Sequence, residues 1–300
     1  MQIAELWRYP IKSLGGERLE ASEVTELGLV GDRGWGIEDV ATGNILTGRR
    51  EAALLLAEGR LADDGTAEVH LDGRVLRTDD ELSDWLGRPV RLRAADAGSR
   101  GTFEAPLDDL DEEHSGWKSW TGPAGAYHDS KRTRVSLIST TTLAGQDPRR
   151  FRANVVLGHD DPAGVTESVE DGWVGQTLVL GDVTLDVRKH IGRCVMVTRP
   201  QPGLGRDLNV LKRINAERAG LAAIGALVTQ PGRITVGDVV TPRTDSAVAH
   251  LVPVSYTHLR AHATVLDLVC RLLPEKKNNH HQHNSSRPST LYNIQTNHNR

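Results

Sequence analysis

The sequence predicts a mainly β, β-rich α+β protein with two barrel-like units and a tail that does not fold. Glycine supplies 30 of the 300 residues, and many glycines stand between short apolar runs, where the chain of a β-rich protein reverses. Asp72-Gly73 separates two alternating apolar runs, and Asp-Gly at such a place is among the strongest hairpin signals. Segments with the apolar spacing of a helix are few. Together these observations favour sheets over helices.

Residues 1–96 are expected to form the first small β-barrel, built from short strands and tight turns. A strand is predicted over 35–39, and the Asp72-Gly73 turn joins strands at 67–71 and 75–76. Thr78 and Glu81 form the capping-box pattern of a short helix that continues to Leu86. Gly87 is then expected to end this helix before Pro89.

Residues 97–130 are polar and rich in glycine, with an acidic run at 108–113. We interpret this segment as a solvated connector. The alternative is a mobile active-site loop in which Trp117 and Trp120 close on a substrate.

Residues 131–245 are expected to form a second β-barrel-like unit. Strands are predicted at 135–138, at 153–157, on both sides of a turn at Gly181-Asp182, and at 234–240. Ser139 is expected to cap a short helix that carries Leu143. The spacing of Leu211, Ile214 and Arg218 predicts a helix over 210–218.

The sequence changes character from about Pro253 onward. It becomes rich in Asn, His and Ser and has too little apolar content to order itself. We expect 252–300 to be a disordered tail that is artefactual rather than part of the native protein. We assign it no function.

Composition limits the class of partner. A formal net charge of −4 does not indicate attraction to nucleic acid. No run of about 18 apolar residues predicts a membrane span, and the first residues lack the pattern of a signal peptide. Two cysteines, Cys194 and Cys270, argue against a disulfide-stapled secreted protein. A cytoplasmic protein with no nucleic-acid or membrane partner is expected.

Cys194 lies in a basic run that includes Arg188, Lys189, His190 and Arg193. A thiolate is both a nucleophile and a soft metal ligand, and nearby cations lower the pKa of a thiol. A lone cysteine also packs as a small buried apolar residue. The local sequence leaves both interpretations open.

Five short motifs follow one another along the chain: Tyr9-Pro-Ile-Lys-Ser13, Gly31-Asp-Arg33, Arg150-Phe-Arg-Ala-Asn154, Gly192-Arg-Cys194 and Gly232-Arg-Ile-Thr-Val-Gly-Asp238. In this order and spacing, they resemble the MOSC family. The resemblance is to members in which a MOSC domain follows a MOSC N-terminal β-barrel domain, such as the YcbX-like proteins and the mitochondrial amidoxime-reducing component. It covers roughly residues 1–242 and implies that 1–96 is the N-terminal domain and 131–245 the MOSC domain.

The resemblance also implies a cofactor, the molybdenum cofactor in its molybdopterin form, with the metal ligated by one cysteine. Cys194 matches that metal ligand and is the implied catalytic residue. The implied cofactor-binding residues are Lys12, Ser13, Arg33, Thr133, Arg152, Asn154, Gly192 and Arg193. Cationic and hydroxyl donors suit this role because a buried phosphate and pterin must regain the hydrogen bonds that they lose with water.

Three features bear on the match. Strand alternation is expected to place Arg152 and Asn154 on one face, although Ala153 stands where the family has proline. Gly192 stands where the family has serine, which removes one hydroxyl. The segment from Glu170 to Trp173 resembles the family's Glu-Asp-x-Trp motif. We expect this segment to shape the site, although Trp173 could equally be an ordinary core residue.

The implied function is a molybdenum-dependent oxidoreductase that reduces N-hydroxylated or N-oxide small molecules. The chain has no cysteine set for an iron–sulfur cluster. We therefore expect electrons from a separate donor protein of the ferredoxin or the cytochrome/flavoprotein type. Two alternatives stay open: a sulfur carrier or sulfurtransferase that uses a Cys194 persulfide, and a non-catalytic protein that binds or delivers the cofactor.

Overall fold

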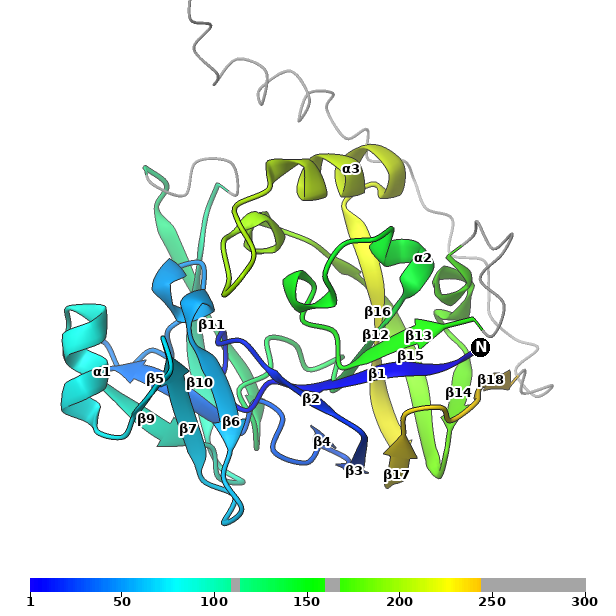
Figure 1. The fold of residues 1–300 in the computed structure, drawn as a ribbon, viewed down its shortest axis with the longest axis horizontal. Coiled ribbons are helices and arrows are strands. Elements are labelled where there is room, and N and C mark those ends of the chain that lie inside the picture. The colour runs from blue at the N-terminus through cyan, green and yellow to red at the C-terminus, as the bar shows by residue number, and fades with distance from the viewer. Residues whose placement is uncertain (109–113, 160–167, 244–300) are drawn as a thin grey trace, which may run out of the picture. The chain divides into compact units, whose positions relative to one another are not determined.

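The computed structural model describes residues 1–108, 114–159 and 168–243, and strands dominate it (Figure 1). The predicted mainly β class is confirmed. The end of the acidic run at 109–113 and the predicted disordered tail at 252–300 lie outside the described residues.

The largest element is a curled eight-stranded sheet in the order β18-β14-β15-β16-β12-β13-β1-β2. Its strands are β1 (Gln2–Arg8), β2 (Glu17–Leu19), β12 (Val135–Ser139), β13 (Val155–Gly158), β14 (Thr177–Leu180), β15 (Val183–Gly192), β16 (Leu221–Gln230) and β18 (Val240–Arg243). Neighbours pair antiparallel except β12 and β13, which are parallel. The turn predicted at Gly181-Asp182 joins β14 to β15.

The start of the chain completes this sheet. β1 pairs with β13, with Leu6 opposite Val155, and Figure 1 shows the two strands side by side. β3 (Ala21–Thr25) pairs with β17 (Gly232–Thr235) and with β4 (Gly28–Leu29). Ile3 and Leu6 belong to the same buried cluster as Leu157 and Ile224. β1, β3 and β4, which the sequence assigned to the first barrel, therefore share a core with the second unit. The division at residue 96 stays a prediction.

Smaller sheets form the rest of the first unit. β5 (Trp35–Asp39) pairs with β9 (Val90–Ala94), and β6 (Glu58–Leu61), β7 (Ala67–Leu71) and β8 (Arg74–Leu76) follow one another. They pack with α1 (Asp79–Leu86) and a 3-10 helix at Ala52–Leu56 around a second buried cluster that includes Ile37, Leu54, Val69 and Leu82.

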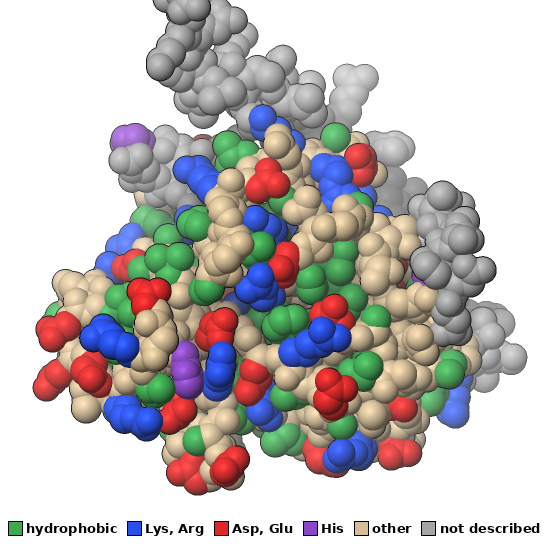
Figure 2. Space-filling view, in the orientation of Figure 1, with side chains coloured by type: hydrophobic (Ala, Val, Ile, Leu, Met, Phe, Trp, Pro, Cys, Tyr) green, Lys and Arg blue, Asp and Glu red, His purple; other side chains and the backbone are tan. Residues whose placement is uncertain are grey.

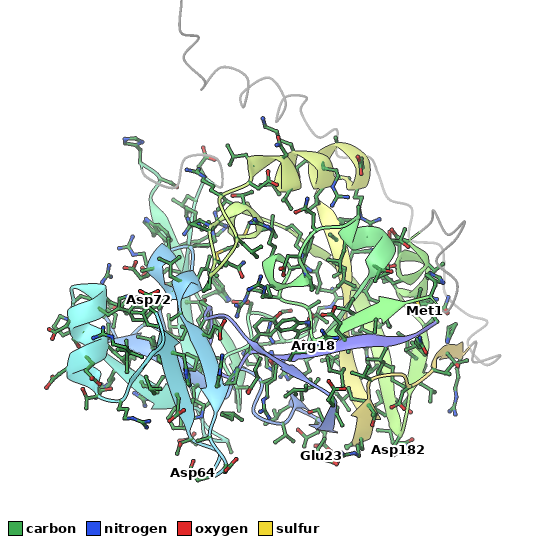
Figure 3. All side chains as sticks on the ribbon, in the orientation of Figure 1. Met1, Arg18, Glu23, Asp64, Asp72 and Asp182 are labelled. Carbon is green, nitrogen blue, oxygen red and sulfur yellow. The ribbon has the colours of Figure 1, made fainter. Side chains whose placement is uncertain are left out.

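Local signals in this unit are confirmed. Asp72 and Gly73, with φ of 49° and 77°, turn the chain between β7 and β8, and Figure 3 labels Asp72 at this turn. The Thr78 side chain accepts from the Glu81 amide while the Glu81 carboxylate accepts from the Thr78 amide, which is the predicted capping box. Gly87 ends α1 with a φ of 65°.

The described part of 97–130, interpreted as a solvated connector, contains two strands that were not predicted from the sequence. β10 (Arg100–Pro106) and β11 (Trp117–Ala124) form an antiparallel pair. Phe103 is fully buried, and its ring centroid lies 5.6 Å from that of Trp120. A Cβ on Gly101 or on Gly122 would come within 2.6 Å of the Phe103 ring. The glycines of this segment therefore allow the backbones of β10 and β11 to pack directly against the Phe103 ring.

The second unit has short helices. Ser139 caps α2 (Thr140–Leu143) through a hydrogen bond from the Thr142 amide, as predicted. α3 (Leu208–Arg218) buries Val210 and Ile214 in one cluster with Val197, from a 3-10 helix at Val195–Thr198. Two other 3-10 helices span Pro148–Arg150 and Val169–Trp173. Among the described helices, none has the length and apolar character needed to cross a bilayer.

Gly16 tests the packing between β1 and β2. A Cβ at Gly16 would lie 2.4 Å from the Arg8 carbonyl oxygen and 2.5 Å from Cδ1 of Tyr9. We expect Gly16→Ala to lower the free energy of unfolding by about 1–3 kcal/mol, because overpacking forces backbone or ring to move. Urea denaturation measures this. Gly172→Ala is the control, since no atom lies within 4 Å of its added methyl. Equal stability of the two variants would contradict the packing argument.

Candidate functional site

A cavity of about 340 Å³ is lined by all nine residues that the family resemblance implies as cofactor or metal ligands. They are Lys12, Ser13, Arg33, Thr133, Arg152, Asn154, Gly192, Arg193 and Cys194. The volume is that of a small-molecule or cofactor site. Four of the five motifs thus meet in one place, whereas no residue of the fifth, at 232–238, lines the cavity. The role of each residue stays a prediction.

The order of the strands explains much of this convergence. β1 runs antiparallel to β13, and β13 runs parallel to β12. The end of β1, which leads to Lys12, therefore meets the starts of β13 and β12, which follow Asn154 and Thr133. β15 reaches Gly192 and delivers Cys194, which is the N-cap of the 3-10 helix at Val195–Thr198.

The cavity lining is strongly cationic. It contains Lys12, Arg33, Arg49, Arg134, Arg150, Arg152, Lys189 and Arg193, against the carboxylates of Glu104 and Asp129. Figure 2 shows Lys and Arg side chains, in blue, near the middle of one face. Such a lining concentrates anionic ligands.

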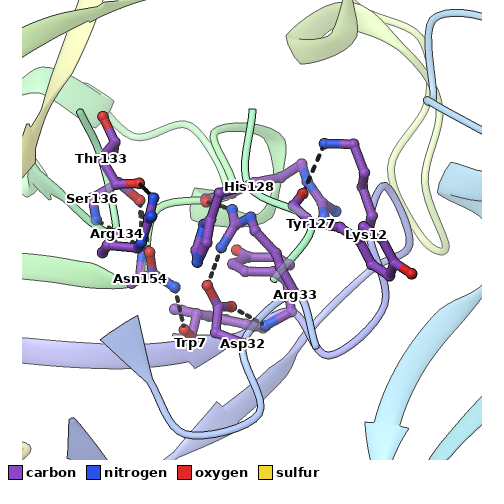
Figure 4. A network of polar contacts seen from close by, with 12 residues as sticks. Trp7, Lys12, Asp32, Arg33, Tyr127, His128, Thr133, Arg134, Ser136 and Asn154 are labelled. Atoms are coloured by element: carbon purple, nitrogen blue, oxygen red, sulfur yellow. Dashed lines mark hydrogen bonds and ion pairs between the residues drawn. The ribbon is translucent and has the colours of Figure 1, made fainter. Parts of the chain in front are cut away.

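Lys12 is buried, with 4% of its surface exposed. Its Nζ donates to Oδ1 of Asp129 at 2.6 Å and to the Tyr127 carbonyl at 3.1 Å, and lies 4.0 Å from the centroid of the Phe103 ring. Figure 4 shows Lys12 reaching toward Tyr127. Burial lowers the pKa of Lys12, and the Asp129 carboxylate opposes this shift. Lys12 is therefore a buried residue of the cavity wall and not an exposed charge on a hairpin.

Arg33 and Arg152 have left-handed backbone conformations, with φ of 54° and 55°. Arg33 pairs with Asp32 and donates to the Arg152 carbonyl at 3.3 Å, while Arg152 donates to the Leu14 carbonyl. Burial, followed by the charge of Arg33, lowers the pKa of Arg152 to about 10. Left-handed conformations are unfavourable for residues with a Cβ and cluster at functional sites.

The predicted alternation of Arg152 and Asn154 along one strand face is wrong. β13 begins at Val155, after the left-handed Arg152. Oδ1 of Asn154 accepts from the amide and hydroxyl of Ser136, at 3.1 and 3.0 Å, and Nδ2 donates to the Trp7 carbonyl at 3.3 Å (Figure 4). Asn154 lines the cavity, but its carboxamide also ties together β1, β12 and β13.

Arg193 and Arg150 anchor the backbone around Cys194. Arg193 donates to the carbonyls of Ala222 at 2.7 Å and Phe151 at 2.8 Å. Burial lowers the pKa of Arg193 to about 10, and the adjacent Cys194 opposes this shift. Arg150 donates to the carbonyls of Val197 and Arg199, at 3.3 Å each, in the segment that follows Cys194. Both guanidiniums restrain the segments next to the thiol.

Two buried polar atoms in the cavity wall lack a hydrogen-bond partner within the described ranges: Oγ1 of Thr133 and Nη2 of Arg193. Buried polar groups usually have a partner, so a ligand with hydrogen-bond acceptors fits here. Gly225 makes room for Thr133, because a Cβ there would lie 2.6 Å from Oγ1. At Gly192 no atom lies within 4 Å of an added Cβ, so the serine found in the family would fit.

Two residues flanking Cys194 do not line the cavity. Arg188 pairs with Asp186 at 2.5 Å, and Nε2 of His190 lies 3.1 Å from the Asp171 carbonyl oxygen. Arg188 and His190, which the sequence grouped with the thiol, therefore lie outside the cavity lining. Side chains of a strand alternate between faces, and only Lys189 and Arg193 of the four flanking basic residues line the cavity.

The segment from Glu170 to Trp173 also lies outside the cavity lining. Oε1 of Glu170 accepts from the Ser139 amide at 3.0 Å, and Trp173 belongs to the main core cluster. This segment supports the fold around α2. Among the described residues, no group of three His, Cys, Asp or Glu side chains could hold a metal ion.

Sequence reasoning missed several cavity residues, among them His128 and Asp129. His128 is 5% exposed, and its Nε2 lies 3.0 Å from the Leu27 carbonyl oxygen. Asp129 pairs with Lys12, 117 positions away in the chain. The adjacent titratable pair His128-Asp129 was the available signal, but it lies in the segment interpreted as a connector.

Comparison with known proteins agrees with the motifs. The model of the MOSC N-terminal beta barrel domain matches residues 1–93, and that of the MOSC domain matches residues 122–241. The chain belongs to the MOSC family. It is 43% identical over 244 residues to mitochondrial amidoxime reducing component 2 of Bos taurus, covering 65% of this chain and 66% of that protein, just under two thirds of its length. The crystal structure of the YUAD protein from Bacillus subtilis aligns with a TM-score of 0.38 and 12% identity, over 80% of this chain and 93% of that one.

His128 predicts a pH dependence of stability. Burial lowers the pKa of His128 to about 4, against about 6.5 in an unfolded chain. Between these values the unfolded state binds the extra proton, so stability falls as the pH drops from 6.5 to 4, by about 3 kcal/mol from this residue. Urea unfolding at pH 7 and pH 4.5 measures the loss. His128→Gln should show a smaller loss than the wild type, and equal losses would contradict this assignment.

Proposed function

We propose that this MOSC protein is a molybdenum-cofactor-dependent reductase of N-hydroxylated or N-oxide small molecules, in which Cys194 ligates the metal. One observation supports the proposal above the rest: the thiol of Cys194 and eight predicted cofactor-binding residues line a single cationic cavity. The name of the bovine relative adds that amidoximes are reduced by a protein of this family.

The donor set suits the cofactor. Molybdopterin carries a phosphate and a pterin with many acceptors. The cavity offers a buried ammonium group, partly buried guanidinium groups, and the Thr133 hydroxyl and Arg193 Nη2, which lack a partner among the described residues. Lys12, Arg33 and Arg152 would hold the anionic part. The Cys194 thiolate is a soft ligand of the kind that molybdenum accepts. When bound, the cofactor supplies the two-electron redox chemistry that removes oxygen from the substrate.

The protein's own residues would hold and orient these groups. Arg193 and Arg150 fix the backbone on either side of Cys194. The thiol is therefore already in position, and binding the metal costs little additional conformational entropy. Asp129 holds Lys12 in the wall, and its carboxylate opposes the lowering of the Lys12 pKa by burial. The electrons would come from a separate donor protein.

The serine variant tests the role of Cys194. We expect about one molybdenum per chain in the wild type from a cofactor-competent host and almost none in Cys194→Ser, because a hydroxyl is a harder and poorer donor to this metal. Elemental analysis by mass spectrometry gives the metal content, and reduction of benzamidoxime gives the activity.

The outcomes separate the candidates. Full metal content in Cys194→Ser would remove Cys194 as the ligand. Wild type that holds molybdenum but reduces no N-hydroxylated compound would favour a cofactor-delivery protein. Wild type without molybdenum, but with a persulfide on Cys194, would favour a sulfur carrier.

Three cationic residues test the cofactor site. Lys12→Ala, Arg33→Ala and Arg152→Ala should each weaken cofactor binding by about 2–5 kcal/mol, because each leaves a desolvated anionic group without its partner. Molybdopterin content after dialysis measures this, with circular dichroism as the folding control. Arg188→Ala is the matched control, because Arg188 is exposed and lies outside the cavity lining. Wild-type cofactor levels in all three variants would refute the proposed site.

A further inference from the structure

Two cationic residues of the cavity share one aromatic neighbour. The guanidinium carbon of Arg33 lies 5.3 Å from the centroid of the Tyr9 ring, and that of Arg152 lies 4.4 Å from it. Both distances are within the range of cation–π attraction. Tyr9 itself does not appear in the cavity lining, so its ring lies behind the two arginines.

The two guanidiniums need such a neighbour. Both lie in the buried wall, and the charge of each disfavours the charge of the other. Asp32 pairs with Arg33. Among the described residues, no carboxylate forms an ion pair with Arg152, whose guanidinium donates to the Leu14 carbonyl. The electron-rich face of an aromatic ring stabilises a desolvated cation without adding a negative charge, so it would not compete with an anionic ligand.

The ring is fixed in place. Tyr9 is 1% exposed, its amide donates to Oδ1 of Asp32 at 2.8 Å, and its carbonyl accepts from the Arg33 amide at 2.8 Å. Gly16 allows the backbone to approach the ring, where any Cβ would lie 2.5 Å from Cδ1. A ring held in this way can fix the guanidiniums next to it.

The hydroxyl of Tyr9 has no comparable role. Its oxygen is buried and has no hydrogen-bond partner within the described parts of the chain. The ring, rather than the hydroxyl, makes the contacts to Arg33 and Arg152.

We propose that Tyr9 is a positioning residue whose ring holds the guanidiniums of Arg33 and Arg152 together as a preformed anion-binding pair. This deepens the proposed function, since the anion there would be the cofactor's phosphate. The pair itself would bind inorganic phosphate whether or not the protein uses molybdenum.

The test uses the full-length, cofactor-free protein and inorganic phosphate, with the rise in melting temperature as the readout. Tyr9→Phe keeps the ring and should respond to phosphate as the wild type does. Tyr9→Leu removes the ring and should need about tenfold more phosphate for the same rise. Adding Tyr9→Leu to Arg152→Ala should cost little more than Arg152→Ala alone, because the two changes remove the same contact.

Leu178→Ala controls for general destabilisation, because Leu178 is buried in the main core and does not line the cavity. It should lower the melting temperature yet keep the phosphate response. The proposal fails if Tyr9→Phe loses the response, if Tyr9→Leu keeps it, if Leu178→Ala loses it as Tyr9→Leu does, or if the wild type shows none. The molybdenum content of the wild-type protein, purified from a cofactor-competent host, tests the proposed function separately.

Discussion

The cavity depends on keeping cations charged in a buried wall. Taking an ammonium or guanidinium out of water is costly unless a partner compensates. Different partners stabilise different cations. Lys12 contacts the Asp129 carboxylate and the Phe103 ring, and Arg33 pairs with Asp32. Arg193 donates to two backbone carbonyls. These partners fix the positions of the cationic side chains before any ligand binds. An anionic ligand then meets groups that are already ordered.

These compensations need segments that are far apart in the chain. Lys12 comes from the end of β1, whereas Tyr127 and Asp129 follow the β10–β11 pair. The same β1 strand is tied to the start of β13 through Asn154 and Trp7. Because the first strand belongs to the large sheet, the motif after it is carried to the Cys194 side of the fold. The pairing of β1 with β13 is thus as important to the site as any residue in the lining.

Close backbone approach is the second requirement. Gly225 leaves space for the Thr133 hydroxyl, and Gly16 leaves space for the Tyr9 ring. The left-handed conformations of Arg33 and Arg152 direct their side chains into the wall at a cost in backbone energy. Packing around these positions is what offsets that cost.

The sequence by itself determined the β-rich class, the Asp72-Gly73 hairpin, the capped helix after Thr78 and the family motifs, because these are local patterns or fixed spacings. It missed the β10–β11 pair, whose order depends on one buried phenylalanine between glycines. It also placed Arg152 and Asn154 on a regular strand, although the strand starts after them. Only the tertiary structure decided that Asp129 pairs with Lys12 and that one tyrosine ring serves two arginines. The contacts of Lys12 with Asp129 and of Tyr9 with Arg152 join residues more than a hundred positions apart. Their energy depends on burial, which no local pattern encodes.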